Sequence, residues 1–433
     1  MSGPTDLVLA GPRPLRGTVR VPGDKGISHR ALLFGALAEG RSHVAGLAGG
    51  DDVRRTRRAV RALGVRVTGS GTTATVTGLG VDGLTEPAGV IDCGNSGTSM
   101  RLLAGLLAGR PFLTVLTGDA SLVTRPMGRV ADPLRAMGAH VDGRAEGTLA
   151  PLVIRGGALA GTTQSLAVAS AQVKTAIVLA GLQAEGITRV TEPAPSRDHT
   201  ERMLAALDAP VRRIDERAVE VTRGAPRPFE LTVPGDPSSA AFWVVAATVT
   251  PGSEVTVEDV CLNPTRIGFV DVLCRMGAEI TVEHRGEVLG EPVGSLHVTA
   301  APLHATVVQG AEIPWVIDEI PALAVAAAFA EGVTEIRDAA ELRVKESDRI
   351  ATITAMLAAF GVASEAVVDG LVVRGGRPVA GRVESHGDHR IAMAAAVAAG
   401  AIEGETTIGD WRSTATSYPE FSADLALLTG GAA

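Results

Sequence analysis

The sequence predicts an α/β protein with two similar domains, each built from three copies of one helix–strand unit. Six segments share one form, namely a polar start, a helix rich in alanine and leucine, a turn with glycine and a β-like run. Between them, five segments are typical of an amphipathic helix followed by a strand. Six units divide naturally into two domains of three.

The six helices of the first kind are apolar on all sides and must therefore be buried. They occur in "SHRALLFGALAEGRSHVAG", "GTSMRLLAGLLAGRPFLTVLTG", "AQVKTAIVLAGLQAEGITRVTE", "PSSAAFWVVAATVTPGSEVTVED", "IDEIPALAVAAAFAEGVTEIRDA" and "GDHRIAMAAAVAAGAIEGETTIGD". A glycine follows each helix, and we expect it to adopt positive φ as a helix cap. These glycines are Gly40, Gly109, Gly186, Gly252, Gly332 and Gly404. We expect a helical core wrapped by sheets and outer helices.

The amphipathic helices belong on the outside of this core. In "RTRRAVRALGVRV" and the residues just before it, Val53, Thr56, Val60 and Leu63 recur at helical spacing, and the arginines fall largely on the other face. We interpret the arginine run as a solvated face rather than a binding patch. The equivalent segments are "GRVADPLRAMGAHV", "HTERMLAALDAPV", "GFVDVLCRMGAEITV" and "DRIATITAMLAAFGV".

Two Val-Pro-Gly-Asp sequences, at 21–24 and 233–236, predict the domain boundaries, because this sequence favours an extended turn suited to a hinge. We expect one domain to comprise residues 21–235. The other comprises residues 1–20 and 236–433, so the chain crosses between domains twice.

Composition excludes several classes of function. The chain has 433 residues, 45% of them hydrophobic, and a formal net charge of −8, which argues against nucleic acid or anionic membranes as partners. No apolar run reaches the roughly 20 residues that span a bilayer, and we see no signal peptide. Cys93, Cys261 and Cys274 form no zinc or CxxC pattern, which favours reduced thiols in the cytoplasm.

The chain uses arginine for nearly every cation and contains only three lysines: Lys25, Lys174 and Lys345. A lysine is a compact donor whose pKa shifts readily, unlike the rigid guanidinium fork. Each of the three lies in a polar cluster, "GDKGISHR", "ASAQVKTA" or "RVKESDR". These lysines are therefore candidates for chemistry.

Polar clusters stand at the starts of all six apolar helices. Capping explains part of them, because Ser, Asp and Asn are favoured there for structural reasons alone. Helix N-termini also attract anions. If the two sets of helices face one cleft, Asp318 and Glu346 are expected to be buried acids in a positive field, as proton transfer requires. The cations added to that cleft are Lys25, Arg30, Arg125, Lys345, Arg349 and Arg390. This pattern predicts an enzyme acting on two small anionic substrates.

Other motifs are weak. "GLGVDG" at 78–83 matches G-x-G-x-x-G, but Pro87 follows and no helix opens there. The sequence has no GxxxxGK[ST] loop for nucleotide phosphates, no histidine pair at zinc spacing and no GxSxG elbow.

Eight segments, in order and nearly end to end, resemble the enolpyruvyl transferase family of 5-enolpyruvylshikimate-3-phosphate (EPSP) synthase. They are "PGDKGISHRALL", "DCGNSGTSMRLL", "LTGDASLVTRPM", "VASAQVKTA", "SRDHTERML", "IDEIPALAVAAA", "LRVKESDR" and "GDHRIAMAAAV". The resemblance implies a two-domain inside-out α/β barrel with three βαβαββ-type repeats per domain and the active site in the cleft between the domains. It implies transfer of the enolpyruvyl group of phosphoenolpyruvate to the 5-hydroxyl of shikimate 3-phosphate, with no cofactor and no metal. A monomer is expected.

The resemblance also implies residue roles. Lys25, Asp318 and Glu346 are the catalytic candidates: Lys25 touches both substrates, Asp318 takes the hydroxyl proton and Glu346 serves the methylene carbon. The candidates for binding shikimate 3-phosphate are Lys25, Gly26, Arg30, Ser170, Gln172, Arg197, Asp318 and Lys345. The candidates for binding phosphoenolpyruvate are Lys25, Asn95, Gly97, Arg125, Gln172, Arg349 and Arg390.

One position departs from the family pattern, which usually has serine where this chain has Gly26. The acceptor could therefore differ, as in a relative from specialised metabolism. The other enolpyruvyl transferase of this fold, which uses UDP-N-acetylglucosamine, carries a cysteine in a loop that reads "GDASLVTRP" here. A non-catalytic anion-binding scaffold is a third alternative.

Overall fold

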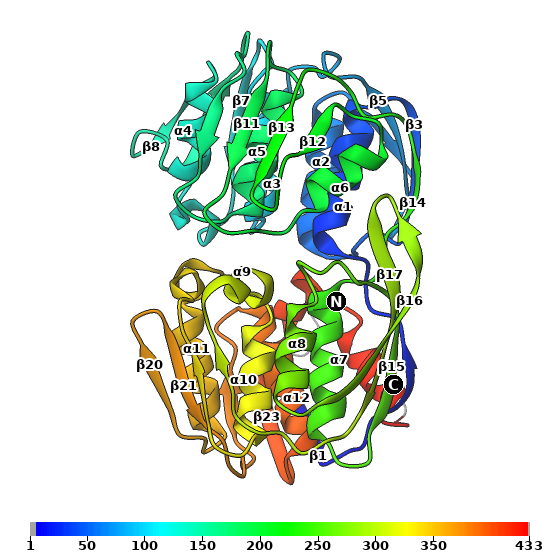
Figure 1. Cartoon of the computed structure of the whole chain (residues 1–433), viewed down its shortest axis with the longest axis vertical. Helices are drawn as coiled ribbons and strands as arrows, with labels where there is room; N and C mark the ends of the chain where they lie inside the picture. Colours follow the sequence, from blue (N-terminus) through cyan, green and yellow to red (C-terminus); the bar gives the residue numbers. More distant parts are fainter. Residues whose placement is uncertain (1–5, 432–433) are drawn as a thin grey trace. The chain divides into compact units, whose positions relative to one another are not determined.

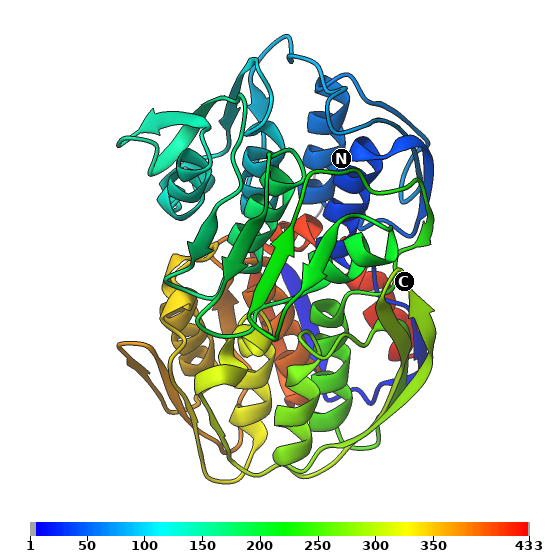
Figure 2. The same ribbon diagram turned by 45° about the horizontal axis from the view of Figure 1, so that its top comes forward.

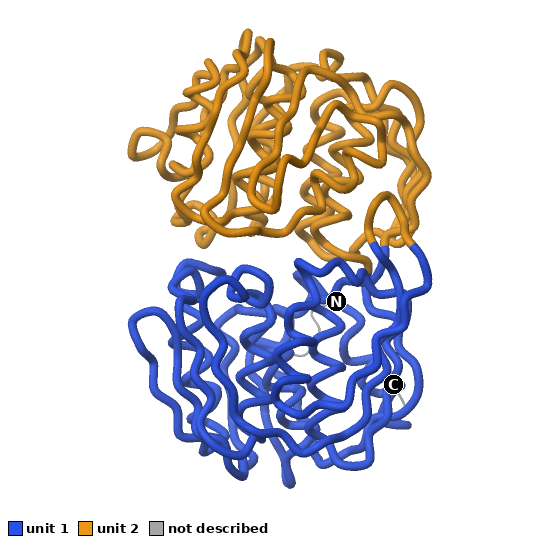
Figure 3. Tube along the Cα trace, viewed as in Figure 1, with its two compact units in different colours: residues 1–22, 234–286, 292–433 blue, residues 23–233, 287–291 orange. Residues whose placement is uncertain are grey.

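The computed structural model describes residues 6–431, and the chain divides into two compact units (Figure 3). Unit 1 takes in Met1–Pro22, Pro234–Gly286 and Pro292–Ala433, of which 1–5 and 432–433 are not described. Unit 2 takes in Gly23–Val233 and Glu287–Glu291. The segment 287–291 contains the turn of a hairpin whose strands otherwise belong to unit 1.

Each unit has three helices at its centre, and these helices are almost entirely buried. In unit 2 they are α1 (Lys25–Leu37), α3 (Gly97–Leu107) and α5 (Ala171–Gly181). In unit 1 they are α7 (Pro237–Val249), α10 (Ile320–Phe329) and α12 (His389–Ala401). Figures 1 and 2 show these helices inside each unit and the strands around them. The six predicted apolar helices are confirmed.

Three small sheets surround the helices of unit 2, and in each the strand that follows a central helix pairs with one parallel and one antiparallel neighbour. Their orders are β14-β3-β5-β4, β6-β7-β9-β8 and β10-β11-β13-β12. The strands are β3 (Glu39–Ala45), β4 (Arg66–Thr68), β5 (Ala74–Leu79), β6 (Ile91–Asp92), β7 (Leu113–Thr117), β8 (His140–Arg144), β9 (Leu149–Arg155), β10 (Thr163–Ser165), β11 (Thr188–Thr191), β12 (Val211–Arg213), β13 (Ala218–Val221) and β14 (Glu230–Thr232).

Unit 1 repeats this arrangement with the orders β16-β17-β15-β2, β18-β19-β21-β20 and β1-β23-β22. In the last sheet β1 lies antiparallel to β23, with Leu7 opposite Ile408, so the N-terminal segment completes the final repeat. The strands are β1 (Leu7–Gly11), β2 (Arg16–Val19), β15 (Glu254–Cys261), β16 (Glu279–Val288), β17 (Glu291–Thr299), β18 (Val307–Val308), β19 (Val333–Ile336), β20 (Ser364–Val367), β21 (Gly370–Arg374), β22 (Arg382–Glu384) and β23 (Gly404–Gly409).

The five predicted amphipathic helices form, each followed by a strand. They are α2 (Asp51–Ala62), α4 (Gly128–Ala136), α6 (His199–Ala206), α8 (Gly268–Arg275) and α11 (Arg349–Ala359). On α2 the apolar stripe from Val53 to Leu63 is buried, while Arg54, Arg58 and Arg61 are exposed, so the solvated arginine face is confirmed. The remaining α-helices of residues 6–431 are α9 (Ile313–Val316) and α13 (Phe421–Leu428).

The turn glycines adopt the predicted positive φ with one exception, but the prediction that they cap the helices is wrong. The C-caps of the central helices are Ala38, Ala108, Leu182, Thr250, Ala330 and Ile402. Five of the six have positive φ, for example +130° at Gly40 and +109° at Gly404. Gly109 does not, so the prediction is wrong there. A Cβ at Gly109 would lie 2.7 Å from Oε1 of Gln183, which means that close packing, not backbone conformation, limits this residue.

Within the part of the chain that is described, no helix combines the length and apolar character needed to cross a membrane. The buried helices are instead short and packed against one another.

Gly105 shows how closely the central helices approach. A Cβ added to this residue of α3 would lie 2.1 Å from the carbonyl oxygen of Ala176 on α5. We therefore expect Gly105→Ala to destabilise the protein by about 1–3 kcal/mol through overpacking. Calorimetric melting of the two proteins measures this.

The matched control is Gly400→Ala in α12, where an added Cβ would meet no atom within 4 Å. Alanine there should be neutral or stabilise by roughly 0.5–1 kcal/mol, because glycine is a poor helix former. Equal melting temperatures for both variants would contradict the packing described here.

Candidate functional site

Polar side chains cap five of the six central helices. Each accepts a hydrogen bond from a backbone N–H in the first turn, and the capping residues are Asp24, Ser96, Ser170, Asp236 and Asp388. Helix α10 lacks such a side-chain bond and begins at Ile320 with proline in its first turn. Capping thus explains the short polar residues but not the cations beside them.

The sequence-predicted site residues fall into two sets, one in each unit. The unit 2 cluster contains Lys25, Gly26, Arg30, Asn95, Gly97, Arg125, Ser170, Gln172 and Arg197. The unit 1 cluster contains Asp318, Lys345, Glu346, Arg349 and Arg390.

Lys25 and Arg30 lie on the first turns of α1. The Nζ atom of Lys25 is 2.9 Å from Oδ2 of Asp52, and 21% of the lysine side chain remains exposed. Arg30 is buried and donates from Nε to Thr200 Oγ1 at 2.7 Å and from Nη2 to Thr175 Oγ1 at 2.8 Å. Hydroxyls of α5 and α6 therefore hold this guanidinium in place.

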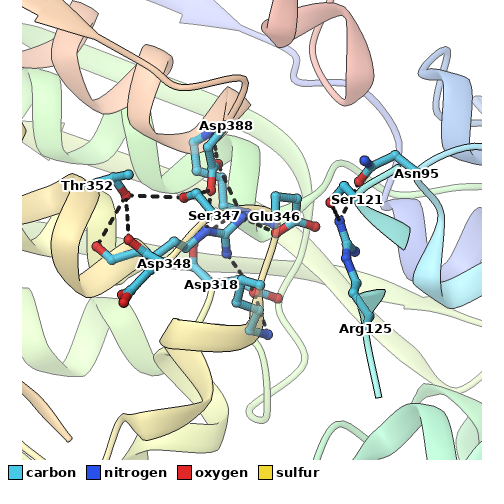
Figure 4. Close-up of polar contacts among 12 residues, drawn as sticks. Asn95, Ser121, Arg125, Asp318, Glu346, Ser347, Asp348, Thr352 and Asp388 are labelled. Atoms are coloured by element: carbon cyan, nitrogen blue, oxygen red, sulfur yellow. Dashed lines mark hydrogen bonds and ion pairs between the residues drawn. The ribbon is translucent and has the colours of Figure 1, made fainter. Parts of the chain in front are cut away.

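Asn95 and Arg125 meet before the start of α3 (Figure 4). Arg125 donates from Nη2 to Oδ1 of Asn95 at 2.5 Å and to Oγ of Ser121 at 3.2 Å. Asn95 in turn donates from Nδ2 to Oδ2 of Asp119 at 2.8 Å. A Cβ at Gly97 would lie 3.1 Å from Nη1 of Arg101, so a side chain there would crowd the guanidinium groups.

Gln172 connects α5 to α3. Its Oε1 accepts from Nη1 of Arg101 at 2.5 Å, and its Nε2 donates to Oγ1 of Thr98 at 2.8 Å. Ser170 precedes Gln172 as the N-cap of α5. Arg197 lies half-buried in the loop between β11 and α6.

A buried chain of hydroxyls joins the starts of α1, α2 and α3. Nδ1 of His29 lies 2.7 Å from Oγ1 of Thr56. The same Thr56 Oγ1 lies 2.7 Å from Oγ of Ser99, and Ser99 Oγ donates to Oγ of Ser96 at 2.7 Å. Burial lowers the pKa of His29 to about 3, and the charges of Lys25 and Arg30 act in the same direction. The imidazole is therefore neutral at physiological pH.

Arg349 organises the unit 1 cluster (Figure 4). This arginine is 1% exposed and donates from Nε to Oδ2 of Asp388 at 2.8 Å and from Nη2 to Oε2 of Glu346 at 2.6 Å. Burial alone would lower the pKa of Arg349, but the carboxylates of Asp388, Glu346 and Asp318 raise it well above its usual value. Burial would likewise raise the pKa of Asp388, yet Arg349 keeps it below its usual value.

Asp318 is the second centre of this cluster. Its Oδ1 is 3.2 Å from Nζ of Lys345 and 3.5 Å from Nη1 of Arg349, and its backbone oxygen accepts from Nη1 of Arg390 at 3.0 Å. All five predicted residues of unit 1 thus belong to one network. The prediction that Asp318 and Glu346 are buried is wrong, because 16% and 22% of their side chains are exposed. Asp318 and Glu346 are therefore partly accessible to solvent, although the Arg349 guanidinium that they contact is buried.

Sequence reasoning missed several members of these networks. Asp52, Arg101 and Asp119 make direct contacts with predicted site residues, and Asp388 is the main partner of Arg349. The sequence places Asp388 at the start of a helix, but its pairing with Arg349 depends on how α11 packs beside α12. Asp52 lies among the arginines of α2, where its neighbours indicated only a solvated surface.

The fold and the two clusters define a class of protein: an α/β protein of six repeats with cations and carboxylates at the starts of buried helices, which suits small anions. The family described as EPSP synthase (3-phosphoshikimate 1-carboxyvinyltransferase) matches residues 9–425. The chain belongs to this family.

Individual relatives agree. The chain is 53% identical to the 3-phosphoshikimate 1-carboxyvinyltransferase of Synechococcus sp. (strain JA-3-3Ab) over 96% of this chain and 95% of the relative. It is 54% identical to that of Pelotomaculum thermopropionicum over 97% and 98%. The solved EPSP synthase of Acinetobacter baumannii superposes with a TM-score of 0.87 at 44% identity, covering 98% of this chain and 97% of that one. The enolpyruvyl transferase NikO from Streptomyces tendae, at 19% identity and a TM-score of 0.78 (98% of this chain, 97% of that one), shows a shared fold alone.

The low pKa of His29 predicts acid sensitivity. The folded-state pKa of about 3 lies below the ordinary value of 6.5, so the unfolded chain binds the extra proton between these values. The contribution of neutral His29 to stability is fully present above pH 6.5 and is lost as pH falls toward 3. We expect the melting temperature of His29→Gln to fall less steeply with decreasing pH than that of the unaltered protein.

Melting curves recorded from about pH 7 to about pH 4 measure this slope, which follows from the difference in bound protons. The control is His43→Gln at an exposed position of β3, which should keep the slope of the unaltered protein. Identical slopes for His29→Gln and the unaltered protein would show that His29 does not stay neutral in the fold.

Proposed function

We propose that this chain transfers the enolpyruvyl group of phosphoenolpyruvate to the 5-hydroxyl of shikimate 3-phosphate and releases phosphate. One observation carries the proposal: the unit 1 residues that match the motifs of the family, Asp318, Lys345, Glu346, Arg349 and Arg390, are joined by ion pairs and hydrogen bonds into one network. The family match over residues 9–425 supports the same reaction.

The unit 1 cluster supplies groups for an addition followed by an elimination. Asp318 accepts the proton of the 5-hydroxyl as the hydroxyl oxygen bonds to C2 of phosphoenolpyruvate. Glu346 enters this step in its protonated form and delivers its proton to the methylene carbon C3, which leaves a carboxylate beside Arg349. The C2–O bond to phosphate then breaks, and Glu346 takes a proton back from C3. Arg349, which contacts both carboxylates, holds them in place and offsets their charge.

The remaining residues bind the two anions. Lys25, Arg30, Ser170, Gln172, Arg197 and Lys345 hold shikimate 3-phosphate, with Gly26 beside them. Asn95, Gly97, Arg125, Arg349 and Arg390 hold phosphoenolpyruvate, and Lys25 and Gln172 serve both ligands. Guanidinium forks suit phosphate and carboxylate groups because they donate two parallel hydrogen bonds.

The proposal requires both clusters to serve one substrate pair, in an active site formed by the domain of residues 21–235 and that of residues 1–20 and 236–433. We further propose that the enzyme acts as a monomer in the cytoplasm. The three free thiols suit a reducing compartment.

Two observations bear on the alternatives. Cys93 is buried, and burial raises its pKa to about 12, so it offers no reactive thiolate of the kind expected for the UDP-N-acetylglucosamine enzyme. At Gly26 a Cβ would lie 3.1 Å from Oδ1 of Asp24, so the usual serine would require Asp24 to shift by a few tenths of an ångström. A different phosphorylated acceptor is therefore the second candidate.

Phosphate release tests the assignment. We expect release only when phosphoenolpyruvate and shikimate 3-phosphate are both present, because the acceptor hydroxyl must add before the phosphate leaves. A coupled phosphate assay measures the rate. Release with UDP-N-acetylglucosamine in place of shikimate 3-phosphate would reverse the assignment.

The variant Lys25→Arg tests whether Lys25 has a chemical role beyond its charge, as expected of an enzyme but not of an anion-binding scaffold. Arginine keeps the charge but replaces the compact ammonium that contacts Asp52, so turnover should fall by at least about tenfold. Absence of release by the unaltered protein with either acceptor would favour the scaffold or an altered acceptor.

A further inference from the structure

Lys174 is the one lysine of the chain that the proposed reaction does not use. It lies on α5, is 3% exposed, and its Nζ is 2.7 Å from Oε2 of Glu192 and 2.7 Å from Oε1 of Glu201. Both carboxylates are buried as well. Burial would lower the pKa of Lys174, but Glu201 and Glu192 raise it, so the ammonium keeps its charge. Removing these three charges from water costs free energy, and close ion pairs with additional hydrogen bonds are needed to offset that cost.

Glu192 differs from Glu201 in what else it holds. Its Oε1 accepts a hydrogen bond from the backbone N–H of Ser170 at 2.9 Å, and its Oε2 accepts from Oγ of Ser196 at 2.8 Å. One carboxylate therefore joins two loops, the one that leads into α5 and the one between β11 and α6. Lys174 fixes that carboxylate from the helix between them.

Both loops carry residues assigned to the phosphorylated acceptor. Ser170 is itself one of them, and Gln172 follows two residues later. Ser196 directly precedes Arg197. Neither loop segment is a helix or strand, so its position depends on bonds of this type.

We propose that Glu192, fixed by Lys174, is a positioning residue that sets Ser170 and Arg197 at the spacing that the acceptor's phosphate requires. The proposal rests on the proposed function, and it assigns Glu192 no contact with substrate. Its effect is on acceptor affinity, because the loops are ordered before the acceptor binds and not during the chemical step.

Glu201 provides a matched control within the same cluster. It makes the same 2.7 Å contact with Lys174, but it lies on helix α6, and its Oε2 accepts no hydrogen bond from any described residue. A purely structural role for the cluster would give variants of Glu192 and Glu201 the same KM for shikimate 3-phosphate, whatever their stabilities. A positioning role makes them different.

The experiment compares Glu192→Gln with Glu201→Gln in the full chain, measuring kcat, the KM for each substrate and the melting temperature. We expect Glu192→Gln to raise the KM for shikimate 3-phosphate by about tenfold while kcat and the KM for phosphoenolpyruvate change less than about twofold, as expected for lost ground-state binding. Glu201→Gln should leave all three kinetic constants within about twofold. Equal effects of the two variants on the KM for shikimate 3-phosphate would overturn the proposal.

If Glu192→Gln does not fold, Ser196→Ala tests the same proposal. It removes only the hydroxyl bond to Glu192 and should raise the KM for shikimate 3-phosphate by about threefold, less than Glu192→Gln does, because Glu192 keeps its contacts with Lys174 and with the backbone of Ser170. An unchanged KM in this variant would also overturn the proposal. Absence of turnover by the unaltered enzyme with these two substrates would instead overturn the proposed function, and this inference with it.

Discussion

The buried charge of Arg349 must be balanced within unit 1, and this requirement determines where the carboxylates of that unit lie. Asp388, Glu346 and Asp318 all accept from its guanidinium, and they come from separate parts of the chain at the starts of α10, α11 and α12. Removing one partner of a buried ion pair costs about 3–5 kcal/mol, since an uncompensated charge remains. The same interaction that stabilises the unit therefore fixes Asp318 and Glu346 relative to each other.

Unit 2 also contains buried cations, but different groups hold them. Hydroxyls of Thr175 and Thr200 hold Arg30, and two carboxylates neutralise Lys174 inside the helical layer. In both units the repeat brings helix starts together, and the polar residues placed there connect one repeat to the next. The fold thus supplies converging N–H groups and caps, while the choice of charged residue at each helix start supplies the chemistry.

Much of the fold was predictable because it repeats. The local pattern predicts the apolar helices, the amphipathic helices between them and the positive φ of five of the six turn glycines. At Gly109 the limit is instead a packing contact with Gln183, which no local pattern shows. Most members of both clusters were predictable from their place at helix starts and from the family resemblance, whereas Arg125 and Arg197 lie away from the starts of the central helices. Their partners were not: Asp52 and Asp388 pair with residues 27 and 39 positions away, and such pairs depend on helix packing. The exposure of Asp318 and Glu346 was wrongly predicted for the same reason.

We propose that two of the carboxylates held by Arg349 divide the proton transfers, with Asp318 acting at the acceptor hydroxyl and Glu346 at the methylene carbon. Deuterium exchange measures this directly: in D2O with shikimate 3-phosphate, NMR follows deuterium entering the methylene group of phosphoenolpyruvate and of the product. We expect Glu346→Gln to abolish this incorporation while both substrates still bind. Incorporation by Glu346→Gln at the rate of the unaltered enzyme would contradict this proposal.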